Sequence, residues 1–336
     1  MNRSAAENPC TLRAMDTWDE GTVLQAAMLA GAGLVLFLFG VGELSTDLRQ
    51  AAGNRIRGWL ERWARGPWRS LAIGCAASVL LHSSSAVIIL AIVLVNANSL
   101  QLRSAMGIVL GANLGTTFGS QIIALDILSW SPAALLLGFL LASIPRTRGH
   151  SANILFHAGM LFFGLWILEL AVAPLHGHPR FLAALAHTET PLTGAGMGAA
   201  ITALLQSSSA TVGMVLVLAK QHLISPLGGI AVMLGAELGT CADTLLATVR
   251  TSRAALKTGL FHLAFNLITV TLALLFFHPF AALIGYVAYA LHIPDDSAST
   301  IALAHILFNL SGVLLFIGTL PAAERLLNAA FRSSAS

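Results

Sequence analysis

The chain repeats itself at a fixed interval of 124 residues. The run L-H-S-S-S-A begins at Leu81 and the run L-Q-S-S-S-A begins at Leu205. A second pair follows, with G-A-N-L-G-T from Gly111 and G-A-E-L-G-T from Gly235. Both pairs are separated by the same 124 positions, without a gap, which indicates an internal duplication. The fold must therefore accommodate two copies of one structural unit, with matching polar runs at equivalent points.

The composition indicates that lipid is the solvent for most of this chain. Hydrophobic residues make up 56% of the 336 residues and charged residues only 10%, whereas a soluble domain carries roughly 25% charged residues. The length allows roughly eight to ten embedded segments at about 20 residues each. The net charge of +3 does not indicate nucleic acid, because the arginines lie between apolar segments. The three cysteines have no metal or disulfide spacing, and we expect no cofactor.

The apolar pattern predicts an all-α polytopic protein of the cytoplasmic membrane, built from two repeats. We divide it into a polar N-terminal tail (1–20), repeat 1 (21–145), repeat 2 with additional helices (146–320) and a C-terminal tail (321–336). Spanning helices are expected at 22–44, 131–145, 152–173, 258–277 and 299–319, a basic amphipathic helix at 45–69, and a loop at 174–193. Segments interrupted by polar runs are expected at 70–98, 104–125 and around 206–209 and 235–241, as broken or re-entrant helices.

Basic residues indicate that the two copies have opposite orientations. Residues 45–69 contain six arginines, whereas the equivalent region of the second copy, 174–193, contains only Arg180. Conversely, Arg250, Arg253 and Lys257 of the second copy correspond to 126–133 of the first, which holds only Asp126. Since basic loops stay on the cytoplasmic side, this exchange predicts an inverted-topology repeat.

The polar runs have the chemistry of a small-ion site. A broken membrane helix leaves free N–H groups at one half-helix, which attract anions, and free carbonyls at the other, which coordinate cations. Serine and threonine add compact hydroxyl groups that serve either ion. The alternative for the serine runs is close helix packing, and for Asn113 and Thr116 it is local capping and interhelical hydrogen bonding. The pairs His262–Asn266 and His305–Asn309 place His and Asn on one helical face, where interhelical hydrogen bonds are the favoured interpretation.

These motifs resemble the type II sodium-dependent phosphate cotransporters and their bacterial relatives. That family has two inverted repeats, each with a Q-S-S-S run followed by G-A/S-N-I-G-T. Here Gln206–Ser209 matches the first motif and Gly111–Thr116 matches the second with Leu for Ile. The late H-x-x-F-N runs are also similar, and the resemblance covers roughly residues 30–320. It implies sodium-coupled transport of inorganic phosphate by alternating access.

By resemblance, both sets of runs form one central site for phosphate and sodium. The phosphate-binding candidates are Ser83, Ser84, Ser85, Gln206, Ser207, Ser208 and Ser209. The candidates for ion binding or coupling are His82, Asn113, Thr116, Thr117, Glu237, Thr240 and Asp243, with sodium held by hydroxyl groups and backbone carbonyls of these runs.

Two residues depart from the family pattern. His82 replaces the usual Gln and Glu237 replaces the usual Asn. A carboxylate within the membrane is a functional candidate by default, so we expect Glu237 to bind the coupling cation or to take up a proton in its place. The alternative is a structural carboxylate satisfied by neighbouring hydroxyls such as Thr240.

Other functions remain open at this stage. Another small oxyanion, or proton in place of sodium, is the nearest alternative. A channel is a second. An intramembrane serine hydrolase using His82 as base is a third, although no G-x-S-x-G nucleophile elbow is present and Gln206 replaces the histidine in the second copy.

Overall fold

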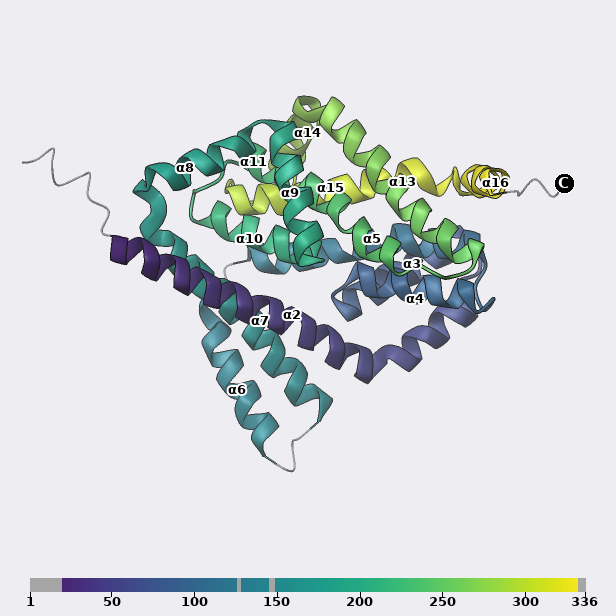
Figure 1. Ribbon diagram of the computed structural model, residues 1–336, viewed down its shortest axis with the longest axis horizontal. Coiled ribbons are helices and arrows are strands. Elements are labelled where there is room, and N and C mark those ends of the chain that lie inside the picture. The colour runs from purple at the N-terminus through teal and green to yellow at the C-terminus, as the bar shows by residue number, and fades with distance from the viewer. Residues whose placement is uncertain (1–19, 126–127, 145–148, 332–336) are drawn as a thin grey trace, which may run out of the picture.

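The computed structural model describes residues 20–125, 128–144 and 149–331, and all regular secondary structure in these ranges is helical (Figure 1). The predicted all-α fold is confirmed. The α-helices are α2 (Glu20–Trp63), α3 (Pro67–Leu81), α4 (Ser84–Asn96), α5 (Leu102–Ala124), α6 (Ser131–Ser143), α7 (His150–Val172), α8 (Pro179–Ala186), α9 (Pro191–Leu205), α10 (Ser208–Lys220), α11 (Pro226–Gly239), α12 (Cys241–Leu246), α13 (Arg253–Leu275), α14 (Phe277–Ala290), α15 (Ser297–Ile317) and α16 (Leu320–Ala330). Three short 3₁₀ helices lie at Leu128–Trp130, Ala173–Gly177 and His187–Glu189. Nearly all of the predicted N-terminal tail, residues 1–19, lies outside the described ranges.

Helix length separates two kinds of membrane segment. Within the described residues, five helical segments are long and apolar enough to cross a membrane, and α5 with the bent continuation into α6 is a possible sixth. They are Val23–Trp63, His150–His176, Pro226–Leu246, Arg253–Leu275 and Ser297–Ile317. By contrast, α3, α4, α9 and α10 have only 13–15 residues, or about 20–22 Å at 1.5 Å per residue. That is too short for a hydrocarbon core of about 30 Å, so these four are half-helices, as the sequence predicted.

The half-helices have the same boundaries in both copies. Helix α3 begins at Pro67 and α9 at Pro191, and each is 15 residues long. The residue after each, His82 or Gln206, has a left-handed backbone with φ of 52° or 55°. This uncommon conformation for a side chain other than glycine reverses the chain into the next half-helix. The 124-residue interval of the sequence is thus also the interval of the backbone turns.

The predicted break within 104–125 is wrong, because α5 is one continuous helix through the G-A-N-L-G-T run. The break expected at 235–241 is slight: α11 and α12 are separated only by Thr240, whose φ of −66° and ψ of −15° are helical. The glycines serve packing instead. A Cβ atom at Gly111 would collide with the backbone of α3, and one at Gly235 would collide in the same way with α9. Such close approach is the usual role of small residues between membrane helices.

Other segments also differ from the sequence-based expectation. Residues 45–69 do not form a separate helix, because α2 continues to Trp63 before the chain turns into α3. The expected loop at 174–193 contains α8 and two 3₁₀ helices. Helices α14 and α16 were not predicted. The first continues an apolar run that we assigned to one span, and the second occupies most of the expected C-terminal tail.

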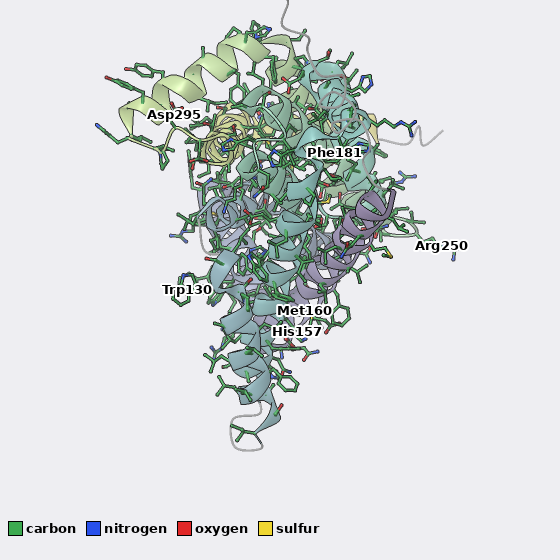
Figure 2. The ribbon with its side chains drawn as sticks, turned by 90° about the vertical axis from the view of Figure 1, so that its left-hand side faces the viewer. Trp130, His157, Met160, Phe181, Arg250 and Asp295 are labelled. Carbon is green, nitrogen blue, oxygen red and sulfur yellow. The ribbon has the colours of Figure 1, made fainter. Side chains whose placement is uncertain are left out.

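The long helices hold the half-helices in place. Helix α2 packs along α7, α3 packs against α5, and α9 packs against α11. Helices α13 and α15 contact both α5 and α11. Helix α6 and the adjoining part of α7 extend away from this body as an antiparallel pair, with Trp130 at the start of α6 pointing outward (Figure 2). Trp130 is 74% exposed, and many apolar side chains of α2 and α6 are exposed as well, which fits lipid contact.

Candidate functional site

The two serine runs meet at one cavity. The cavity has a volume of about 600 Å³ and is lined by α2, by the α3–α4 and α9–α10 turns, and by Thr240 after α11. Its lining includes the sequence-predicted residues His82, Ser83, Ser84, Ser85, Gln206, Ser207, Ser208, Ser209 and Thr240. Runs that are 124 residues apart in sequence therefore form opposite parts of one chamber.

A half-helix begins at each serine run. The Ser83 hydroxyl accepts a hydrogen bond from the Ala86 N–H, and the Ser207 hydroxyl accepts one from the Ala210 N–H, both at 3.2 Å. These are N-cap contacts, which explain why α4 and α10 start where they do. Because a hydroxyl that accepts through its oxygen still has its own hydrogen, both caps keep a donor. The N–H groups of the first turn have no helical carbonyl partner, so both helix starts have the polarity that attracts an anion.

Arg49 of α2 also lines this cavity. Its Nε donates to the Ser45 carbonyl at 3.2 Å and its Nη2 to the Thr46 hydroxyl at 3.2 Å. Among the described residues of the lining, it is the one with a permanent charge. The sequence analysis placed Arg49 in a basic surface segment and missed this position. The second copy has Ala173 at the equivalent point, so the duplication offered no signal for it.

A second group of oxygens adjoins the cavity on the side of α12. The Ser85 and Thr240 hydroxyls are 3.4 Å apart, and the Asp243 carboxylate contacts the Ser85 hydroxyl. Asp243 also accepts a hydrogen bond from the Thr244 N–H at 2.6 Å. Asp243 is half-buried. The structure thus joins Ser85 from the first copy with Thr240 and Asp243 from the second.

The predicted residues of α5 lie elsewhere. Asn113 and Thr117 are both 1% exposed and do not line the large cavity. The Thr116 hydroxyl donates to the Asn113 carbonyl at 2.8 Å and the Thr117 hydroxyl to the Leu114 carbonyl at 2.7 Å. These contacts within the helix agree with the local-bonding alternative for Thr116. They use only the backbone carbonyl of Asn113, whose buried side-chain amide nitrogen has no hydrogen-bond partner among the described residues. Thr116 additionally lines a small pocket beside the cavity, together with His82 and Ser209.

Glu237 is buried behind the cavity rather than in its wall. It is 1% exposed, and its Oε1 lies 2.9 Å from Nε2 of His305 on α15. Its partner is therefore a histidine of a late H-x-x-F-N run and not the Thr240 hydroxyl considered from sequence. The preceding run is also engaged between helices, since His262 Nδ1 lies 2.8 Å from the Thr244 hydroxyl. The interpretation of these runs as sources of interhelical hydrogen bonds is confirmed.

The fold and the cavity define a helical membrane protein with a central polar site between two copies of one unit. A family model described as Na+/Pi-cotransporter matches residues 36–169 and 178–318. The chain belongs to this family, as the motifs indicated, and it is therefore a member of a family of phosphate transporters.

Curated relatives agree with this membership. The chain is 28% identical over 291 residues to "Uncharacterized protein YqeW" of Bacillus subtilis. This match covers 84% of this chain and 91% of the relative. It is 28% identical over 258 residues to "Putative inorganic phosphate export protein YjbB" of Salmonella typhimurium and 27% over 292 residues to the protein of that name in Escherichia coli. Those matches cover 75% and 85% of this chain but only 47% and 52% of the relatives, so the chain spans about half the length of the YjbB proteins. No solved structure gives a significant match.

Proposed function

We propose that this protein is a secondary active transporter that moves inorganic phosphate across the cytoplasmic membrane, coupled to sodium, by alternating access. The observation that carries the proposal is the meeting of two serine-capped helix starts in one cavity that also contains Arg49. Membership of the Na+/Pi-cotransporter family supports the same substrate and ion.

The cavity suits the chemistry of phosphate. Phosphate presents only acceptor oxygens where it is ionised, and the site offers donors from both sides: the Ser83 and Ser207 hydroxyls and the N–H groups of the first helical turns. A charge-assisted hydrogen bond is roughly twice as strong as a neutral one. Arg49 supplies a compensating positive charge at the same chamber, and the arginine fork fits phosphate oxygens particularly well.

For sodium, we propose the oxygens beside the cavity at Ser85, Thr240 and Asp243. Sodium prefers hard oxygen ligands, and this group combines two hydroxyls with one carboxylate. Since a cation here would lie close to the phosphate chamber, each ion would reduce the electrostatic cost of binding the other. That mutual effect is the physical basis of coupling.

Phosphate flux in proteoliposomes tests the proposal. Purified protein is reconstituted, and entry of labelled phosphate is followed with an imposed sodium gradient, with the same gradient of potassium, and with none. We expect saturable uptake that needs sodium and is competed by unlabelled phosphate more strongly than by sulfate. Because YjbB relatives are named as export proteins, exit from preloaded vesicles is measured too. Flux that does not saturate would instead indicate a channel, and competition dominated by sulfate would indicate another oxyanion.

A further inference from the structure

The buried Glu237–His305 pair belongs to a longer hydrogen-bonded chain. His305 Nε2 faces Glu237 Oε1 at 2.9 Å, and its Nδ1 lies 2.8 Å from the Ser120 hydroxyl of α5. The Ser120 hydroxyl in turn lies 2.7 Å from the Thr117 carbonyl. Three helices, α5, α11 and α15, therefore meet through one imidazole that is 3% exposed.

The hydrogen bonds from Glu237 through His305 to Ser120 and Thr117 are compatible with two protonation states that have the same heavy-atom positions. A carbonyl only accepts, so the short contact with Thr117 uses the Ser120 hydroxyl hydrogen. His305 Nδ1 must then carry a hydrogen for Ser120. One further proton lies between Nε2 and the Glu237 carboxyl group, which makes the pair neutral overall. All three contacts are satisfied in this state.

The second state lacks one proton. If the Nδ1 proton leaves, the Ser120 hydroxyl rotates and donates to Nδ1, while Nε2–H donates to an ionised Glu237. Only one hydroxyl hydrogen moves, because hydroxyl groups turn freely to suit their partners. The loss leaves the Thr117 carbonyl without this donor and places a net negative charge in the core, where an uncompensated charge is costly.

The second late histidine provides an internal comparison. His262 Nδ1 lies 2.8 Å from the Thr244 hydroxyl, which donates to the Cys241 carbonyl at 3.1 Å. Its Nε2, however, faces the amide nitrogen of Asn266 at 3.1 Å, and the same amide nitrogen donates to the Glu237 carbonyl at 2.8 Å. An amide N–H only donates, so His262 is held as the neutral Nδ1–H form. The two sites share a histidine and a hydroxyl, and only the one at Glu237 has a partner that exchanges a proton.

The Glu237–His305 pair has a route to the cavity. His305 and Ser120 line a small pocket of about 10 Å³, together with His82 and Ser209. This volume is close to the room that a single water needs. His82 and Ser209 also line the large cavity, so the pocket lies between the imidazole and the chamber that we assign to phosphate.

We propose that the Glu237–His305 pair is a proton-binding site that exchanges one proton with the cavity through the small pocket, so that transport by this protein carries a proton. The inference rests on the proposed function for its transport consequence, but not for the proton site itself. The proton leaves Nδ1 for water in the pocket, and Glu237 keeps the negative charge. Binding of phosphate, an anion, in the adjoining chamber favours the protonated pair.

Few other ionisable groups face this pair. On α12 they are Cys241 and Asp243, on α13 it is His262, and at the end of α3 it is His82. Helices α2 and α7 also line the small pocket, and they carry the largely buried pair of Asp47 and His157, whose Oδ2 and Nδ1 are 2.6 Å apart. Arg103 lies near the start of α5, where it pairs with Glu324. Asp243, like Glu237, is close enough to Cys241 to influence it, so this second carboxylate requires its own variant in the test.

Two measurements test the proposal independently. In the first, proteoliposomes enclose a pH-sensitive dye, and internal pH is recorded as phosphate is added outside. Because phosphate itself carries exchangeable protons, the proton signal is divided by the labelled phosphate taken up in the same vesicles. The parent should move more protons per phosphate than Glu237→Gln. Glu237→Asn, which introduces the residue found at position 113 of the first copy, is the second variant if the first does not fold.

Glu169→Gln is the matched control, because Glu169 is a half-buried carboxylate of α7 bonded to Gln221, and it should retain the ratio of the parent. Asp243→Asn should alter the sodium response of transport, and in the NMR measurement described next it should leave the pH response of the His305 signals unchanged.

In the second measurement, the histidine nitrogens of ¹⁵N-labelled protein in micelles are followed by NMR as pH varies over the folded range. The His305 signals, assigned by their loss in His305→Gln, should change with pH and become pH-independent in Glu237→Gln. The His262 signals should stay those of a neutral imidazole protonated at Nδ1 throughout the pH range. His305 signals that do not change with pH, or a ratio of protons to phosphate that is the same in both Glu237 variants as in the parent, would overturn the proposal. Absence of phosphate flux in the parent would instead overturn the proposed function, and the NMR result would still decide the proton site.

Discussion

Replacing Ser207 by alanine separates the two roles that the structure gives this hydroxyl. As an N-cap it accepts from the Ala210 N–H, and loss of such a cap costs about 1 kcal/mol of stability. As a cavity donor its hydrogen is available to phosphate. Losing a hydrogen bond to a charged ligand costs about 1.5–3 kcal/mol, roughly a ten- to hundred-fold loss of affinity. Ser207→Ala should therefore lower both the unfolding temperature and the apparent affinity for phosphate.

Ser252→Ala is the control that isolates the second effect. Ser252 caps α13 in the same way, accepting from the Ala255 N–H at 3.3 Å, but it does not line the cavity. Thermal unfolding in detergent should show similar losses for the two variants. Labelled-phosphate uptake in proteoliposomes should show a ten- to hundred-fold higher KM for Ser207→Ala only. If both variants have the KM of the parent, the serine runs serve helix packing and capping, and the anion-site argument fails.

Three further predictions address charge, packing and topology. Arg49→Gln should raise the phosphate KM at least several-fold, and this effect should weaken with added salt. Arg55 is an exposed arginine of the same helix, and Arg55→Gln should leave the KM unchanged. Equal KM values for the two variants would show that Arg49 does not belong to the site. Gly235→Ala should destabilise the protein by about 1–3 kcal/mol, because the added methyl group would overpack against α9. Thermal unfolding measures this loss, and an unchanged unfolding temperature would contradict the packing role. In a background without native cysteines, Ala51→Cys and Ala183→Cys should react with impermeant thiol reagents from opposite faces of the membrane, and labelling of both from one face would refute the inverted repeat.

The half-helices were predictable because their signals are local. A run of polar residues that interrupts an apolar segment was sufficient to predict the breaks at Ser83 and Ser207. The duplication then predicted that both breaks belong together, and they line one cavity. The same approach failed at Gly111, because glycine at a helix break and glycine at a helix contact look alike in sequence. Only the position of α3 against α5 distinguishes them.

The contributions of Arg49 and His305 depend on tertiary packing, which the sequence could not supply. Arg49 follows an apolar helix among five other arginines of residues 45–69, and only the path of α2 past the serine turns brings it to the cavity. His305 lies 68 positions from Glu237 and 185 from Ser120. The sequence did indicate that Glu237 is exceptional. It could not indicate whether the carboxylate meets a cation, a hydroxyl or a histidine.

The two copies agree where backbone geometry is required and differ where charge is required. The left-handed residues His82 and Gln206 have φ values within a few degrees of each other, because each must reverse the chain at the same point. Charge follows another rule: Arg49 corresponds to Ala173, and Glu237 to Asn113. In the chamber that we propose for phosphate, one arginine supplies positive charge to an anion between the two copies, and a second arginine would repel the first. Likewise, one exchangeable proton beside the site suffices, so duplication leaves the other copy free to retain a neutral amide. The asymmetry of this chain therefore accumulates in its ionisable residues, while its helix breaks remain symmetric.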